Sequence, residues 1–85
     1  MKEFSYTITD PEGIHARPAT LFVKEAMKYP CGITLEKDGK QADAKRMFAV
    51  MGMGIKQGQE VVLRCDGEQE DEAMEALSAF LKENM

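Results

Sequence analysis

The chain has no tryptophan, one histidine, two cysteines and three prolines among its 85 residues. It also has no apolar run near the roughly 20 residues that cross a bilayer, and the segment 1–10 has no signal-peptide core. We therefore expect a cytoplasmic protein that does not insert into membranes. A chain of this length is too short to build two cores, so residues 1–85 are expected to form one domain.

Basic residues are in the minority, with 11 Lys and Arg against 15 Asp and Glu, a formal net charge of −4. Such a chain has no general basic surface for phosphate backbones, and only Phe and Tyr, four and two of them, are present to stack on bases. A nucleic-acid partner is therefore disfavoured. No Cys-x-x-Cys pair occurs, and Cys31, Cys65 and His15 are too few to close a structural zinc site. We expect no metal and two reduced, buried thiols.

The hydrophobic pattern predicts seven elements in the order β-α-β-β-α-β-α. Alternating apolar residues predict a strand over 2–8, and β-branched residues predict another over 60–65. Two short strands, 33–36 and 41–44, flank an Asp-Gly hairpin turn at 38–39. Helical spacing predicts helices over 16–29 and 68–84, with a short one inside 45–54. One antiparallel sheet with helices on one face, an α+β sandwich, is the economical arrangement.

The stretch GIHARPAT, residues 13–20, contains the only histidine, His15. Pro18 suits the first turn of a helix, so a helix is expected to begin within a residue or two of His15. The imidazole would then lie beside free backbone N–H groups at the positive end of a helix, where Ala16 and Arg17 can bind a phosphate. Neutral imidazole is also a nucleophile. These residues are compatible with a phosphorylated histidine, and equally with a surface histidine next to an unrelated arginine.

A second unusual stretch is RMFAVMGM, residues 46–53. A short helix buries only one apolar stripe, and Met-rich exposed surface is typical of docking to several partners. Inward packing is expected for Val50, and it stays an alternative for Met47. The chain also lacks a nucleotide-binding loop and a catalytic cluster, so it would have to receive a phosphoryl group and hand it on.

GIHARPAT, the hairpin DGK at 38–40, GIKQG at 54–58 before a strand, and the length of the chain together resemble the HPr-like family. These are phosphocarrier proteins of the bacterial phosphoenolpyruvate-dependent sugar phosphotransferase system. The resemblance implies an open-faced sandwich of four antiparallel strands and three helices in a monomeric protein. It also implies a phosphoryl carrier that is not an independent catalyst and that uses no cofactor.

The resemblance further implies roles for single residues. His15 would accept a phosphoryl group on a ring nitrogen from enzyme I and pass it to the A domain of a sugar permease, and Arg17 would bind that group. The face that meets both partners would be formed by Thr20, Lys24, Met47, Phe48 and Met51.

Two positions depart from the family pattern. Many relatives have a regulatory serine where this chain has Arg46, so regulation by phosphorylation there is expected to be absent. Together with Lys45 and Lys24, Arg46 is expected to make the docking face positive. Glu12 replaces a small polar residue, and its carboxylate could repel the phosphoryl group or orient the imidazole. These departures leave an alternative, an HPr-like regulatory binding module without phosphoryl flux.

Overall fold

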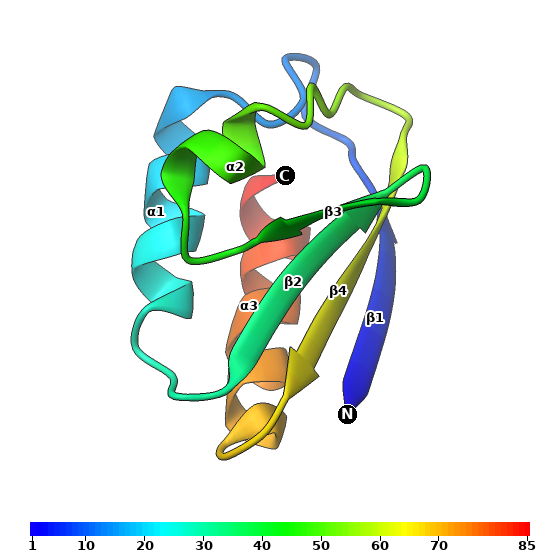
Figure 1. Ribbon diagram of the computed structural model, residues 1–85. Coiled ribbons are helices and arrows are strands. Elements are labelled where there is room, and N and C mark those ends of the chain that lie inside the picture. The colour runs from blue at the N-terminus through cyan, green and yellow to red at the C-terminus, as the bar shows by residue number, and fades with distance from the viewer.

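The computed structural model describes residues 1–85 as four strands and three helices in the predicted order. The strands are β1 (Lys2–Thr7), β2 (Gly32–Lys37), β3 (Lys40–Asp43) and β4 (Glu60–Asp66). The helices are α1 (Ala16–Ala26), α2 (Met47–Met51) and α3 (Glu70–Asn84) (Figure 1). None of the three helices is both long and apolar enough to cross a bilayer.

Two helix ends differ from the sequence prediction. α1 ends at Ala26 and not at Tyr29, because the amides of Lys28 and Tyr29 bond to carbonyls three residues back and tighten the chain into turns. α3 begins at Glu70, two residues later than predicted, because Gln69 has a left-handed φ of 63° that a helix cannot continue through. Element boundaries respond to such local dihedrals more than to the apolar stripe.

The sheet is antiparallel throughout, with the strand order β1-β4-β2-β3. All three helices cover one face of this sheet and leave the other face open (Figure 1). The predicted α+β class, a four-stranded open-faced sandwich with three helices, is therefore confirmed. The hairpin between β2 and β3 turns at Asp38 and Gly39 as predicted, both with positive φ.

The core lies between the sheet and the helices. Along β4 the buried residues Val61, Leu63 and Cys65 alternate with Val62 and Arg64, which face the open side. The same period in β2 buries Ile33 and Leu35. α1 and α3 complete the core with their buried apolar residues, Ala19, Phe22, Val23, Ala26, Ala73, Leu77 and Leu81. No polar or charged residue is buried, so the core is held by apolar packing.

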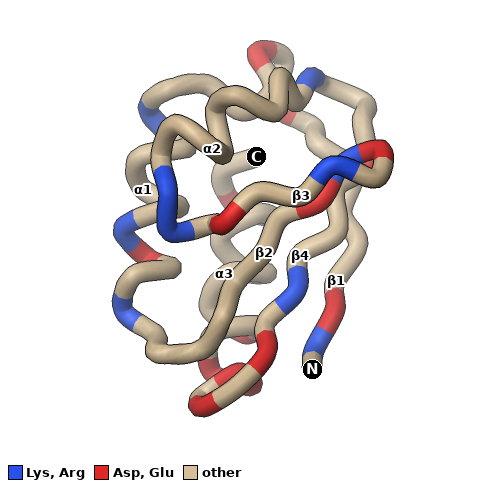
Figure 2. Tube along the Cα trace, viewed as in Figure 1, with Lys and Arg blue, Asp and Glu red and all other residues tan.

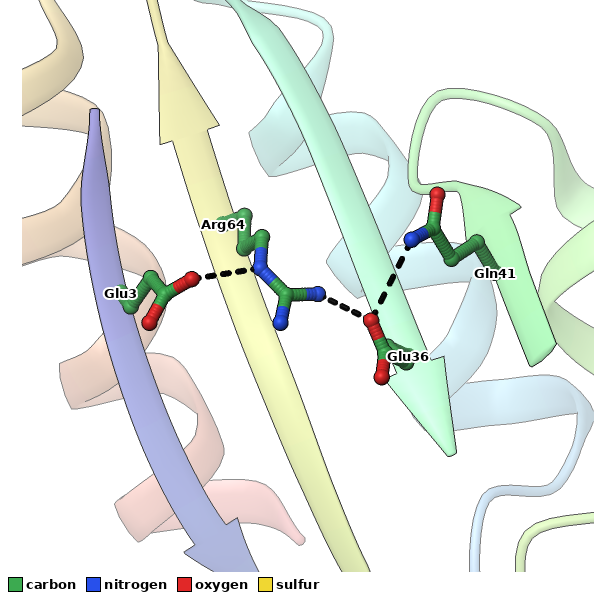
Figure 3. Close-up of polar contacts among 4 residues, drawn as sticks. All are labelled: Glu3, Glu36, Gln41 and Arg64. Atoms are coloured by element: carbon green, nitrogen blue, oxygen red, sulfur yellow. Dashed lines mark hydrogen bonds and ion pairs between the residues drawn. The ribbon is translucent and has the colours of Figure 1, made fainter. Parts of the chain in front are cut away.

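The open face of the sheet has a polar network that joins one residue from each of the four strands (Figure 3). Nε of Arg64 in β4 donates to Oε2 of Glu3 in β1 at 2.6 Å, and its Nη1 donates to Oε1 of Glu36 in β2. The same Glu36 oxygen accepts from Nε2 of Gln41 in β3 at 3.3 Å. The hydrogen bonds to Glu3 and Glu36 raise the pKa of Arg64 above its ordinary value. The network gives the uncovered face a solvated surface.

The two cysteines lie at the same end of the sheet. Cys31 directly precedes β2, and Cys65 pairs with Ile33 of that strand. Both thiols are free and buried. Burial, with a smaller contribution from the neighbouring Cys31, raises the pKa of Cys65 from 9.0 to about 11. Because the pKa is higher in the folded state, the neutral thiol contributes to stability below about pH 9, and this contribution is lost as the pH rises through about 11.

We predict that folded Cys65 reacts with a thiolate-selective disulfide reagent at pH 8 at least about a hundredfold more slowly than in denaturant. A rise in pKa of about two lowers the thiolate fraction by that factor, and burial adds to it. Stopped-flow measurement on the variant Cys31→Ala isolates this thiol. Reaction of the folded variant at the rate of a free cysteine would contradict the predicted slow reaction. If neither cysteine of the unmodified chain reacted in denaturant, the thiols would not be free.

Candidate functional site

The loop between β1 and α1 is fixed by a close backbone contact. Gly13 has a φ of +68°, and a Cβ at this position would come within 2.3 Å of the carbonyl oxygen of Ile55. That same oxygen accepts the Ile14 amide at 3.1 Å. Only glycine combines this dihedral with this approach. Residue 13 is therefore held against the segment that leads into β4.

The other side of the loop is held by the end of α3. The amides of Thr9 and Asp10 donate to the backbone oxygen of Met85 at 2.6 and 2.9 Å. Within the loop, the Asp10 side chain accepts the Glu12 amide at 2.8 Å, and its carbonyl accepts the Gly13 amide at 2.9 Å. These bonds form a tight turn within the stretch TDPEG, residues 9–13, whose Asp, Pro and Gly are typical turn residues.

His15 is the N-cap residue of α1, as the position of Pro18 predicts. Its carbonyl accepts the first intrahelical bond, from the amide of Ala19 at 3.0 Å, and its side chain makes no capping hydrogen bond. The amides of Ala16 and Arg17 precede that first donor, so the helix itself does not use them. The side chain of His15 is 37% exposed. The imidazole is thus accessible at the positive end of a helix.

Two carboxylates lie beside the imidazole. Oε2 of Glu12 is 3.3 Å from Nε2 of His15, and Oδ2 of Asp10 is 3.7 Å from the same nitrogen. Sequence reasoning identified Glu12 but missed Asp10, whose only sign was its place at the start of a turn. One ligand atom of each residue lies within 4.8 Å of the others, which is the one grouping of three potential metal ligands in the chain. A metal there would bind the same imidazole that a phosphoryl group would use.

Arg17 lies in the same surface depression as His15. This depression is lined by six residues, Asp10, His15, Arg17, Pro18, Leu21 and Asn84. A guanidinium can grip a phosphate with two parallel hydrogen bonds, and helix-terminal amides can bind the remaining oxygens. The structure therefore places His15 and Arg17 around one depression, and the unused amide of Ala16 is next to His15 in the chain. The arrangement can hold a phosphoryl group on or beside the imidazole.

The five residues expected to meet partners lie on α1 and α2. Thr20 donates its hydroxyl to the Ala16 carbonyl at 2.8 Å and to Sδ of Met47 at 3.6 Å, so it joins the two helices. Phe48 is 89% exposed and Met51 is 37% exposed, whereas Met47 packs partly against the core. Lys24 is exposed on α1. Val50 is buried, which confirms its expected inward packing.

Basic residues gather on the helical side of the molecule, although the whole chain is acidic. Figure 2 shows Lys and Arg along α1 and before α2, whereas Asp and Glu crowd the turn between β4 and α3. One expectation needs correction. Nζ of Lys45 donates to the carbonyls of Tyr29 and Cys31 at 2.7 and 2.8 Å, so its charge holds the chain between α1 and β2. Of the three expected cations, Lys24 and Arg46 remain exposed.

Comparisons with known proteins agree with this geometry. The family model described as the PTS HPr component phosphorylation site matches residues 2–83. The phosphocarrier protein HPr of Lysinibacillus sphaericus is 42% identical over 83 residues, which cover 98% of this chain and 94% of that protein. The HPr-like protein Crh of Bacillus subtilis strain 168 is 44% identical over 73 residues, 86% of each chain.

Solved structures match equally well. A crystal structure of HPr-C-His from Thermoanaerobacter tengcongensis aligns with a TM-score of 0.92 at 41% identity, over 96% of this chain and 92% of that one. An HPr dimer from the same organism aligns with a TM-score of 0.78 at 41% identity, over 98% and 95% of the two chains. The open-faced sandwich and the single imidazole at the start of a helix define the class of this protein, the small phosphocarrier domains. The chain belongs to the HPr family of phosphocarrier proteins of the phosphotransferase system.

We predict that Gly13→Ala lowers the free energy of unfolding by at least about 2 kcal/mol, because it adds a clash with the Ile55 carbonyl to the strain of a positive φ. Gly39→Ala is the matched control, since Gly39 has a φ of +80° and no atom within 4 Å of its added Cβ. Urea unfolding of both variants checks the difference. Equal losses in the two variants would show that the loop moves away from Ile55 at no cost.

Proposed function

We propose that this chain carries a phosphoryl group within the sugar phosphotransferase system, accepting it on His15 from enzyme I and passing it to the A domains of sugar permeases. The observation that supports this most directly is the position of the chain's only imidazole. It is partly exposed at the start of α1, beside two amides that the helix does not use, and shares a depression with Arg17. In this proposal His15 is the nucleophile, and Arg17 with the Ala16 amide binds the phosphoryl oxygens.

The shape of the site fits a carrier that is not an independent catalyst. A shallow depression on a small domain does not enclose a substrate, so the groups that activate a phosphate must come from the partner. The exposed residues Lys24, Phe48 and Met51 supply a surface for that partner, together with the half-buried Thr20 and Met47. No cofactor enters the proposed reaction.

Regulation, assembly and location complete the proposal. Arg46 precedes α2 and has no hydroxyl, so phosphorylation at this position is absent. The chain is proposed to act as a monomer, with size-exclusion chromatography and light scattering as the direct test against the dimeric form seen in a relative. The proposed location is the cytoplasm, where unpaired thiols such as Cys31 and Cys65 stay reduced.

A regulatory binding module without phosphoryl flux is the second candidate. The similarity to Crh, slightly higher in identity than that to HPr but over a shorter stretch, favours it. Such a module would use the exposed face of α1 and α2 and would leave His15 unmodified. Phosphoryl acceptance therefore separates the two candidates.

Incubation with labelled phosphoenolpyruvate and enzyme I should place one acid-labile label per chain on His15. His15→Ala should take none and keep its fold, because a partly exposed loop histidine contributes little packing. Arg17→Ala should slow transfer about tenfold or more through loss of the charged clamp. Lys40→Ala, which removes an exposed cation from the remote hairpin, is the control and should transfer normally. An unlabelled wild-type chain would favour the regulatory module.

Phe48→Ala should weaken binding to enzyme I about thirtyfold, because an exposed aromatic at the centre of an interface contributes about 2 kcal/mol. Its melting temperature should barely change, since the side chain makes little contact in the free protein. Met27→Ala removes another exposed apolar side chain, at the far end of α1, and serves as the control. Calorimetric titration and thermal unfolding provide the two measurements. A large loss of stability with unchanged binding would assign Phe48 to the core.

A further inference from the structure

The two ring nitrogens of His15 have different surroundings. Nε2 lies 3.3 Å from a carboxylate oxygen of Glu12 and 3.7 Å from one of Asp10. Nδ1 takes part in no ion pair and makes no capping bond to α1. A neutral imidazole has its proton on one nitrogen and a lone pair on the other. Negative charge beside Nε2 favours the proton at that nitrogen, because a lone pair there would face the two carboxylates.

The two carboxylates differ in how firmly they are held. Asp10 has a side chain only 25% exposed, its Oδ1 accepts the Glu12 amide, and its own amide bonds to Met85. Its second oxygen therefore faces the imidazole from a fixed position. Glu12 is closer to Nε2, but its side chain is 74% exposed, so water screens its charge. Asp10 thus supplies the fixed charge, and Glu12 the nearer one.

We propose that Glu12, supported by Asp10, is a positioning residue that keeps the proton of His15 on Nε2 and leaves the lone pair on Nδ1 for the phosphorus atom. This inference rests on the proposed phosphoryl transfer and adds a role for the residue that departs from the family pattern. It also decides between the two effects expected of Glu12. The carboxylate orients the ring, because it faces the nitrogen that does not receive the phosphoryl group.

The transfer step balances without a further reactant. The lone pair of Nδ1 forms the new bond to phosphorus while the bond between phosphorus and its donor atom in phosphorylated enzyme I breaks, its electron pair staying with the donor. The proton on Nε2 does not leave, so the phosphorylated ring is a cation until the group is passed on. Glu12 and Asp10 then face that cation, and this attraction offsets the repulsion between the carboxylates and the phosphoryl oxygens.

Nitrogen-15 NMR of the imidazole, at a pH where the ring is neutral, measures the ratio of the two tautomers. The variants are Glu12→Gln, Asp10→Asn and the double variant, with Glu68→Gln as a control that removes an equal charge from an exposed turn. Asparagine keeps an oxygen for the Glu12 amide, so the loop is preserved. The ratio of Nε2–H to Nδ1–H should fall about two- to fivefold in Glu12→Gln, the range for an exposed charge pair. It should fall further in the double variant and stay unchanged in the control.

The rate of phosphoryl acceptance from enzyme I should fall in the same order of variants. An unchanged tautomer ratio in the double variant overturns the inference, and so does faster acceptance in Glu12→Gln, which would mean that the carboxylate chiefly repels the incoming group. A wild-type chain that accepts no phosphoryl group overturns the proposed function instead. In that case the tautomer ratios still show whether Glu12 and Asp10 set the protonated nitrogen.

Discussion

The close approach of Gly13 to the Ile55 carbonyl is the constraint on which the whole site depends. It pins the loop before α1 to the segment that enters β4, a strand inside the sheet. The Ile14 amide bonds to the same oxygen, so two contacts with Ile55 hold the chain just before the first turn of α1. The position of the imidazole therefore follows from backbone contacts, and the side chain of His15 makes no capping hydrogen bond to α1. The backbone contacts thus hold His15 in place while its imidazole is available to react.

The two faces of the sheet differ in their surroundings: one is covered by the helices and the other is open to solvent. One face packs against the helices and sets the spacing between α1 and α2, which Thr20 joins through the sulfur of Met47. The other face has charged and amide side chains bridged by Arg64 and is solvated. Every feature of the site and the exposed apolar residues of α2 lie on the helical side. Recognition and chemistry are therefore concentrated on one side of a molecule that is acidic as a whole.

The elements and the start of α1 could be predicted from the sequence, because alternation, helical spacing and a first-turn proline each act over a few residues. Of the residues around the imidazole, the sequence singles out Ala16, Arg17 and Glu12, but not Asp10. Asp10 reaches His15 through a turn closed by its own side chain, and sequence distance does not show where such a turn points. The sequence places Lys45 on the docking face, but its Nζ donates to the carbonyls of Tyr29 and Cys31, in the segment between α1 and β2. A long side chain such as lysine can reach several acceptors, and only the folded structure shows which acceptor lies within hydrogen-bond distance.

The uncapped start of α1 has a consequence for the balance between stability and activity. Ser, Asp or Asn at an N-cap stabilises a helix by about 1 kcal/mol, and acids in the first turn add to this. α3 has three such acids, Glu70, Asp71 and Glu72, whereas the first turns of α1 and α2 have none, and no N-cap side chain of the three helices makes a capping hydrogen bond. α1 thus lacks both stabilising features at the helix start that carries the imidazole. Selection for a better cap at position 15 would stabilise the domain and remove its reactive group in the same substitution.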